Sequence, residues 1–405
     1  MPRSSLLLFA LSLAACASRG PGPSLAPSAT EVAAPTETAA APEPTPAHLL
    51  ESAESALASG EAARAVALFG RYLAGGPTGE DARQAYLGLA SAHESLRDCA
   101  AALRVYGAYL EHFPEAADRA EVHGRRGACA AELEEWESSA AAYAAARAAA
   151  TDALPSVRVE FLAREGYARF QLGDFDAADK LLGEADAVFT AAQEAGAERF
   201  TTYYFVGMAR FYLAAIHHRR FREAPIRLPE KTMAEDFARK FEHLQRAQEA
   251  YNHTIRAKHM FWVSAAGYQL GSLFEEFYDA LMHAPVPEWL DDKQRQVYYE
   301  ELKGQLRPVV NKAIWVFEKN LETARRLGYE SHFIEQTEAK LSELQGILLA
   351  GDSGWGKPHP RLAPDARGEI ATTQGSSLPG GASGDGSEPL PAADRKLFVP
   401  IPTAL

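Results

Sequence analysis

The chain has 405 residues and a formal net charge of −13, with 54 acidic side chains against 41 basic ones. This acidic balance excludes nucleic acid as a main ligand, because a phosphate-binding surface requires a basic excess. Hydrophobic residues make up 47% of the sequence. That share supports a large core, and the abundance of alanine favours helix, so we expect one large or two smaller helical domains.

Residues 1–15 are expected to be an export signal. Arg3 supplies a positive charge, and residues 6–13 form an apolar run that is too short to span a bilayer. The run ends in Leu-Ala-Ala-Cys at Cys16, which resembles a bacterial lipobox. The resemblance implies lipidation of Cys16, and the alternative is an ordinary signal with a cysteine nearby by chance. Several acyl chains on Cys16 anchor a protein stably, and Ala17 in place of Asp favours the outer membrane, with the chain facing the periplasm.

Two segments lack the apolar side chains that a packed core needs. Residues 16–46 consist mainly of Ala, Pro, Ser, Thr and Glu, and predict a disordered tether. Residues 351–405 are rich in Gly, Ser, Pro and Asp, and predict a disordered tail. Near its end, residues 397–402 read Leu-Phe-Val-Pro-Ile-Pro. This apolar segment is either a linear motif for another protein or a ligand for the chain's own helices.

Residues 47–197 contain a helical pattern that repeats after 37 residues. A small residue, an aromatic residue, Leu and Pro follow one another at Ala65, Phe69, Leu73 and Pro77, and again in residues 102–114. Residues four apart share one face of a helix, and proline prevents the helix from continuing. The spacing predicts a helix-turn-helix repeat. The expected helix pairs are 47–59/61–75, 79–96/98–112, 117–132/134–150 and 156–172/174–195.

The fourth copy adds Gly166-x-x-Arg169 and then Gly173-Asp174-Phe175. Together these residues resemble an array of tetratricopeptide repeats (TPR). The resemblance implies an all-α, TPR-type α-solenoid of about six helix pairs plus a capping helix, with a concave groove lined by the first helix of each pair. Its apolar to acidic character suits an amphipathic or basic peptide. The positions assigned to the groove are Gln84, Leu87, Ser91 and Glu94 in copy two, and Glu160, Ala163, Tyr167 and Phe170 in copy four.

Residues 198–350 predict two further, degenerate repeats. Each keeps the spacing of a second helix, but an insertion with proline separates it from its first helix. A final helix is expected to cap the array with its apolar side inward. The expected elements are a first helix at about 199–218, an insertion with Pro225 and Pro229, a second helix around 247–255, a first helix opening at Leu270-Gly271, a second helix around 313–321, and a cap at about 330–349 with Ile334, Leu341 and Leu344 inward.

Two features of this second half are candidates for partner binding. Arg219, Arg220 and Arg222 form a basic run that is either a solvated helix end or a docking patch for an acidic partner, an anionic lipid or a cell-wall polymer. The insertion at residues 284–292 contains Pro285, Pro287 and Trp289. Insertions in solenoids often carry binding, so Trp289 is either packed on its own helices or an exposed anchor.

Cys99 and Cys129 each lie fifteen residues from Pro114. If the two helices around that turn are antiparallel, both cysteines sit at the same height. In an oxidising compartment a disulfide would then stabilise the fold by roughly 3–4 kcal/mol. The alternative is two buried free thiols, since cysteine is a good small core residue.

No catalytic constellation emerges from the sequence. It contains neither a phosphate-binding glycine loop nor a His-Glu-x-x-His zinc helix. The acidic pairs Glu275-Glu276 and Glu300-Glu301 point to different sides of a helix and are expected to be surface charge. His93 occupies a position where the repeat usually has an aromatic residue, so we expect it to pack. We predict no enzyme, no cofactor and no metal.

A narrower resemblance covers residues 203–344. It rests on Phe211-Tyr212-Leu213, Leu228-Pro229-Glu230-Lys231, Ala247-Gln248-x-x-Tyr251, Trp262-x-x-Ala265-Ala266-Gly267, Ala284-Pro285-Val286-Pro287, Tyr298-x-x-Glu301-Leu302 and Lys312-Ala313-Ile314. These residues resemble TPR proteins of the envelope-spanning gliding-motility machinery. The resemblance implies a non-enzymatic scaffold that binds other envelope proteins. The alternatives are a lipoprotein that assists outer-membrane protein assembly or regulates cell-wall enzymes, and a carrier of a small ligand.

Overall fold

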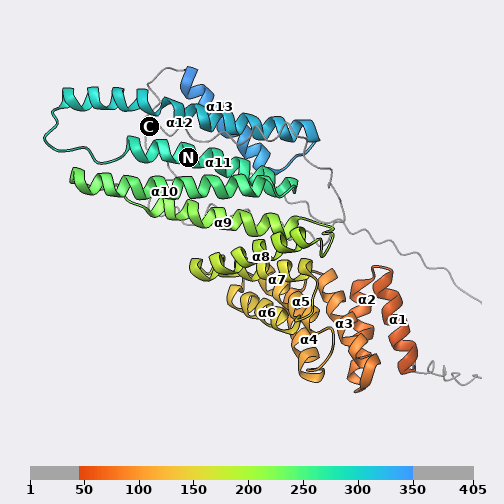
Figure 1. Cartoon of the computed structure of the whole chain (residues 1–405). Coiled ribbons are helices and arrows are strands. Elements are labelled where there is room, and N and C mark those ends of the chain that lie inside the picture. Colours follow the sequence, from red (N-terminus) through yellow and green to blue (C-terminus); the bar gives the residue numbers. More distant parts are fainter. Residues whose placement is uncertain (1–44, 350–405) are drawn as a thin grey trace, which may run out of the picture. The chain divides into compact units, whose positions relative to one another are not determined.

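The computed structural model describes residues 45–349, and every regular element in that range is an α-helix. The expected signal peptide, Cys16, most of the expected tether and the expected tail lie outside the described residues. Thirteen helices are described, as Figure 1 shows: α1 (Pro46–Ala58), α2 (Ala62–Ala74), α3 (Gly79–Ser95), α4 (Cys99–His112), α5 (Arg119–Glu132), α6 (Trp136–Ala149), α7 (Pro155–Gln171), α8 (Phe175–Ala195), α9 (Tyr204–Glu223), α10 (Glu230–Ile255), α11 (Met260–Met282), α12 (Asp292–Leu327) and α13 (His332–Leu349).

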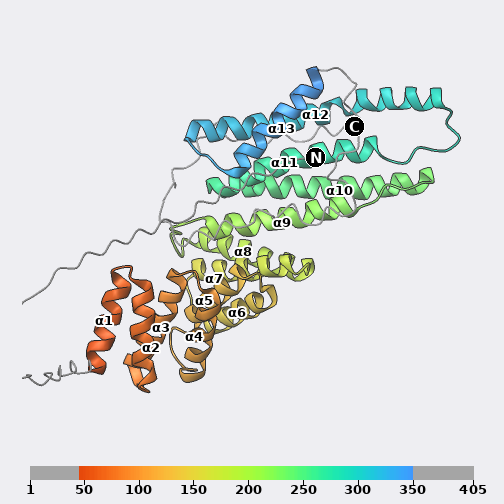
Figure 2. The ribbon, with the colours of Figure 1, turned by 180° about the vertical axis from the view of Figure 1, so that it is seen from behind.

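Helices that follow one another in the chain also pack against one another. In addition, the first helices of successive pairs touch: α7 packs on α9, α9 on α11, and α11 on α13. From both sides of the molecule, α9, α10, α11 and α12 lie side by side (Figures 1 and 2). Such nearest-neighbour packing of helix pairs defines a solenoid. The predicted all-α solenoid is therefore the observed fold.

The predicted helix bounds agree closely with the structure for the first eight helices, but α9 begins later than expected, and α11 begins at Met260, ten residues before the expected opening at Leu270. Helix α9 starts at Tyr204 rather than near residue 199. Gly196 ends α8 in the left-handed conformation, with φ of 60°. Thr202 Oγ1 then accepts a hydrogen bond from the Tyr204 amide at 3.1 Å. A hydroxyl that satisfies a free amide favours a helix start there, which the apolar spacing alone did not indicate.

The aromatic residue of each repeat fills the gap between its helices, as the spacing predicts. In several pairs a glycine of the first helix lies opposite it, because no larger residue fits there. A Cβ atom on Gly127 would lie 2.9 Å from the Tyr143 ring, and one on Gly271 would lie 2.2 Å from the Phe317 ring. Close packing of this kind leaves no room for an added methyl group. The buried repeat aromatics are Phe69, Tyr106, Tyr143, Tyr251 and Phe317.

Gly271 of α11 and Gly304 of α12 allow the same substitution to be compared in a packed and in an open environment. We expect Gly271→Ala to lower the free energy of unfolding by about 1–3 kcal/mol, because the methyl group collides with the buried Phe317 ring. Gly304→Ala serves as the control. It places a methyl group in open space on α12 and should raise stability by up to about 1 kcal/mol through helix propensity. Urea unfolding followed by circular dichroism measures both changes, and equal effects would contradict the packing argument.

Candidate partner-binding surfaces

Among the predicted groove residues of copy two, some side chains are accessible and one bonds to residues of its own chain. Gln84 on α3 is exposed and Leu87 is half-buried. Glu94 is engaged: its carboxylate accepts hydrogen bonds from the Tyr106 hydroxyl and from Arg125 Nη2, both at 2.6 Å. Because Arg125 belongs to α5, Glu94 links copy two to copy three. Glu94 as a contact for an outside partner stays a prediction.

In copy four the groove positions also separate into two groups. Glu160 is half-buried and accepts a hydrogen bond from Arg164 Nε at 2.9 Å. Tyr167 is half-buried. Phe170 is only 8% exposed, and its ring packs on Phe175. The Phe170 ring also lies 5.0 Å from that of Tyr212 on α9, so Phe170 is mostly covered by its own chain, and its contact with a partner stays a prediction.

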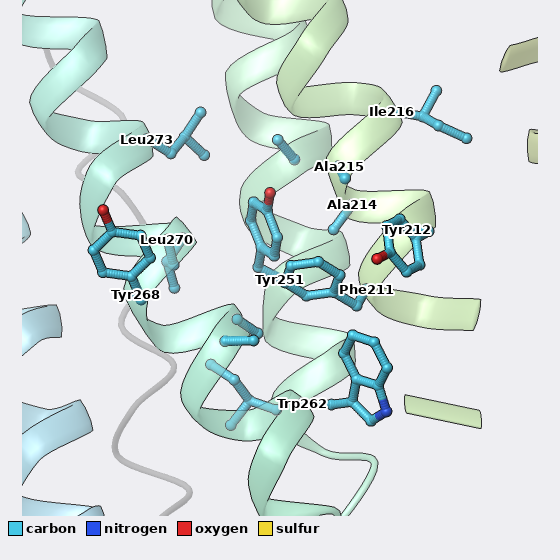
Figure 3. Close-up of a cluster of buried hydrophobic side chains, with 14 of the residues drawn as sticks. Phe211, Tyr212, Ala214, Ala215, Ile216, Tyr251, Trp262, Tyr268, Leu270 and Leu273 are labelled. Carbon is cyan, nitrogen blue, oxygen red and sulfur yellow. The ribbon is translucent and has the colours of Figure 1, made fainter. Parts of the chain in front are cut away.

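An aromatic row connects the first helices of the last three repeat copies. Tyr167 of α7 lies 4.7 Å from Tyr212 of α9, between ring centroids, and Tyr212 lies 5.9 Å from Trp262 of α11. Tyr204, also of α9, lies 5.4 Å from the same Trp262 ring. Figure 3 shows Tyr212 and Trp262 converging from the two helices. We define the aromatic row as these four residues.

The aromatic row is partly open. Tyr167 and Tyr204 are half-buried, whereas Tyr212 and Trp262 are buried. Burial raises the pKa of Tyr204 to about 12, so its hydroxyl keeps its proton at neutral pH. Beside the row, the Arg164 guanidinium lies 4.6 Å from the Phe205 ring centroid. Aromatic rings with a neighbouring cation are common in protein-binding sites. The sequence did not indicate this row, because its members come from three helices.

The basic run on α9 is neutralised by carboxylates of the same chain. Arg219 Nε donates to Glu223 at 2.8 Å. Arg220 donates to Asp179 of α8 at 3.1 Å. Arg222 donates to Glu276 of α11 from two nitrogens. These ion pairs weigh against an open docking patch and favour a role in joining helices; partner binding by the three arginines stays a prediction.

The acidic neighbours Glu275 and Glu276 are buried, which corrects their assignment as surface charge. They were predicted to point to different sides of a helix, and each meets a cation of another helix. Lys340 of α13 donates to Glu275 at 2.8 Å. Glu276 faces α9, where Arg222 Nε donates to it at 2.6 Å. The charges are buried because helices on both sides cover α11. Glu300 and Glu301 of α12 are exposed, as predicted.

Glu276 is the centre of a buried polar network. His218, which has no exposed surface, places its two ring nitrogens 3.1 Å from the Tyr251 hydroxyl and 3.1 Å from Glu276. Burial opposes ionisation of Glu276, but His218 and Arg222 outweigh it and hold the pKa of Glu276 well below its ordinary value. Burial lowers the pKa of His218. The network thus holds an ionised carboxylate and favours a neutral imidazole.

Burial of His218 makes the stability of the protein depend on pH. Its folded pKa lies below the unfolded value of about 6.5, so the unfolded chain binds the proton more readily. Stability is therefore complete above that pH and falls as the pH drops, by at most about 1.4 kcal/mol per pH unit from this group. Melting temperatures between pH 8 and pH 5 measure the slope. We expect His218→Gln to reduce this slope.

Trp289 is an exposed side chain in the loop between α11 and α12. It is 72% exposed, and its indole Nε1 donates to Glu230, at the start of α10, at 3.4 Å. Of the two alternatives for Trp289, the structure matches the exposed side chain rather than a packed lid. Pro285 is exposed in the same loop, and Pro287 is half-buried. Whether these residues bind a partner stays a prediction.

Cys99 and Cys129 are neighbouring buried thiols on α4 and α5. Each is within hydrogen-bond reach of the other, and both are free in this structure. Cys99 Sγ also donates to Glu132 at 3.1 Å. Burial raises the pKa of Cys99 to about 11 and that of Cys129 further. The predicted placement at the same height is confirmed, and the disulfide itself stays a prediction.

No family model and no curated protein matches the chain. Among solved structures, the chain is similar to a tetratricopeptide repeat protein from Parabacteroides merdae, at 14% identity, with 74% of this chain and 98% of that chain covered and a TM-score of 0.35. That likeness is too low to carry an inference about fold or function. The description of the solenoid therefore rests on the packing of its helices.

The described residues were compared with the requirements of a membrane-spanning helix and of a metal site. No helix between residues 45 and 349 has the length and apolar character needed to cross a membrane. Within the same range, no group of three or more His, Cys, Asp and Glu side chains is arranged to hold a metal ion.

Proposed function

We propose that the chain is a non-enzymatic scaffold that holds protein partners through its helix-pair solenoid. The observation that carries this proposal is the aromatic row between α7, α9 and α11, with Tyr167 and Tyr204 half-buried. A partner that covers these rings gains apolar burial at little entropic cost, because the rings are already held by their neighbours.

The proposed setting is the periplasmic side of the bacterial outer membrane, with Cys16 as the lipid anchor. This part rests on the sequence alone, because Cys16 lies outside the described residues. The partners are other envelope proteins, and the resemblance of residues 203–344 names the gliding-motility machinery as the complex. The proposed partner is an amphipathic or basic segment, since Glu160 lies beside the row and the chain carries a net charge of −13.

The test is affinity capture from chemically crosslinked cells that express the chain. Motility-complex subunits among the captured proteins support the proposal. Barrel-assembly proteins or cell-wall enzymes support the alternative, a lipoprotein that assists outer-membrane protein assembly or regulates those enzymes. A lone chain with a bound small molecule contradicts both.

Capture by the aromatic row is distinguished from capture by another surface with two charge-changing variants. We expect Tyr167→Glu to reduce the yield of the partner at least tenfold, because a carboxylate at the row costs about 1.4 kcal/mol or more on binding. Thr190→Glu introduces the same carboxylate at an exposed residue of α8 and should leave the yield unchanged. Circular dichroism of both variants establishes that the fold is retained. Equal capture by both variants places the partner elsewhere.

A further inference from the structure

Helix α12 is twice as long as the helix that caps it. It has 36 residues and α13 has 18, which correspond to about 54 Å and 27 Å of helix. Helix α13 contacts the second half of α12, where Asn320 donates to Thr337 at 3.0 Å and Arg325 pairs with Glu338 at 3.4 Å. The capping helix therefore leaves the first half of α12 uncovered.

Burial along α12 follows the same division. All of its buried residues lie between Leu306 and Ala324. In the first half of α12, Tyr299 and Leu302 are half-buried and pack against the core, while the residues on the other side of the helix are exposed. Val297 is 63% exposed and Tyr298 is 38% exposed. Val297 and Tyr298 are thus two adjacent, exposed apolar side chains among charged and polar ones, and exposed apolar surface can mark an interaction site.

The open face is a stripe along the helix axis. Val297, Glu301, Gly304 and Pro308 follow at spacings of four, three and four residues, so they lie above one another, and all four are exposed. Pro308 has no amide hydrogen, so the carbonyl of Gly304 receives no hydrogen bond from the residue four positions on. The stripe thus combines the apolar side chains of Val297 and Pro308, the Glu301 carboxylate, a glycine without a side chain and a carbonyl acceptor.

We propose that the segment Leu397–Pro402 of the same chain docks on the stripe of α12, next to Tyr298. Its six residues are all apolar and two are proline. Proline-containing apolar segments bind surfaces that present aromatic rings, because they lose little conformational entropy on binding. Tyr298, next to the stripe, and Trp289 in the preceding loop are exposed aromatic rings.

The length of chain beyond α13 allows this contact. Forty-seven residues separate Leu349 from Leu397, which reach about 155 Å when fully extended and about 40 Å on average as a flexible chain. Residues 292–305, which precede the first buried residue of α12, span about 21 Å of helix. A tether of this kind gives an effective concentration on the order of 1 mM, so that even a Kd of about 0.1 mM protects the stripe about tenfold. No other protein is needed, so the inference is independent of the proposed partner.

A photocrosslinker placed in the full-length chain tests the contact. We replace Tyr298 with p-benzoylphenylalanine and map the crosslinked peptides by mass spectrometry. The expected product joins α12 to residues 397–402 and is lost in the triple variant Leu397→Ser/Phe398→Ser/Ile401→Ser. The same crosslinker at Glu318, an exposed residue of the capped half of α12, is the matched control and should not react with the tail.

Two outcomes overturn the inference. The first is a crosslink that persists in the triple variant or is absent from the full-length chain. The second is a crosslink between copies, which a mixture of isotopically heavy and light protein reveals and which would assign the stripe to self-association. Hydrogen exchange of residues 292–305 provides a measurement without the crosslinker: we expect it to be about tenfold faster in the triple variant than in the wild type. Equal exchange in both proteins contradicts docking.

Discussion

Replacement of Glu276 by leucine is expected to lower the free energy of unfolding by about 3–5 kcal/mol, because it leaves buried cationic and polar groups without their carboxylate. Glu276 receives hydrogen bonds from Arg222 of α9 and faces the fully buried His218. Arg222 reaches solvent with 28% of its side chain, whereas the His218 side chain has no exposed surface. The loss is measured by urea unfolding, with hydrogen exchange in α11 as a local readout.

The matched control for this prediction is Glu300→Leu, which makes the same substitution at an exposed acid of α12. We expect it to change stability by no more than about 0.5 kcal/mol. The double variant Glu276→Leu/Arg222→Met should recover at least about 1 kcal/mol, since it removes both partners of the pair. Strict additivity of the two single effects would show that the pair is not coupled.

Oxidation of Cys99 and Cys129 to a disulfide is expected to raise the free energy of unfolding by roughly 3–4 kcal/mol, because the bond closes a loop of about thirty residues in the unfolded chain. The two thiols lie in one buried cluster between α4 and α5, so the bond would join neighbouring residues. Their raised pKa keeps them protonated, and protonated thiols exchange slowly. We therefore expect the bond to form with a disulfide catalyst rather than in air.

Alkylation of the unfolded, unreduced protein, followed by mass spectrometry, shows whether Cys99 and Cys129 are bridged. Melting temperatures with and without reductant measure the gain in stability. In Cys129→Ala the bond cannot form, so reductant should have no effect on that variant. Two freely alkylated thiols in protein prepared from an oxidising compartment would contradict the prediction.

The bounds of the first eight helices were predictable because local interactions set them. Residues four apart share a helix face, and turn residues such as Gly173 and Gly196 have positive φ where the chain leaves a helix. The buried repeat aromatics, from Phe69 to Phe317, followed from the same spacing. The later start of α9 was missed because a single side chain, Thr202, decides it.

Side-chain environments were predicted less well, because each depends on residues that are far apart in the sequence. Glu276 pairs with an arginine 54 residues away and Glu275 with a lysine 65 residues away, so spacing within α11 gave no sign of burial. The basic run on α9 offered two alternatives, and only the carboxylates of α8 and α11 distinguish them. For Trp289 the neighbouring helices decide between a packed and an exposed side chain.

The sequence by itself determined that this protein is an all-α array of helix pairs, since helical spacing and turn residues act within one repeat. Only the tertiary structure decided which surfaces remain open. The aromatic row joins three helices, and the stripe on α12 is exposed because α13 is half as long as the helix it covers. Exposure is a property of what packs beside a residue, and in a solenoid that neighbour belongs to the next repeat.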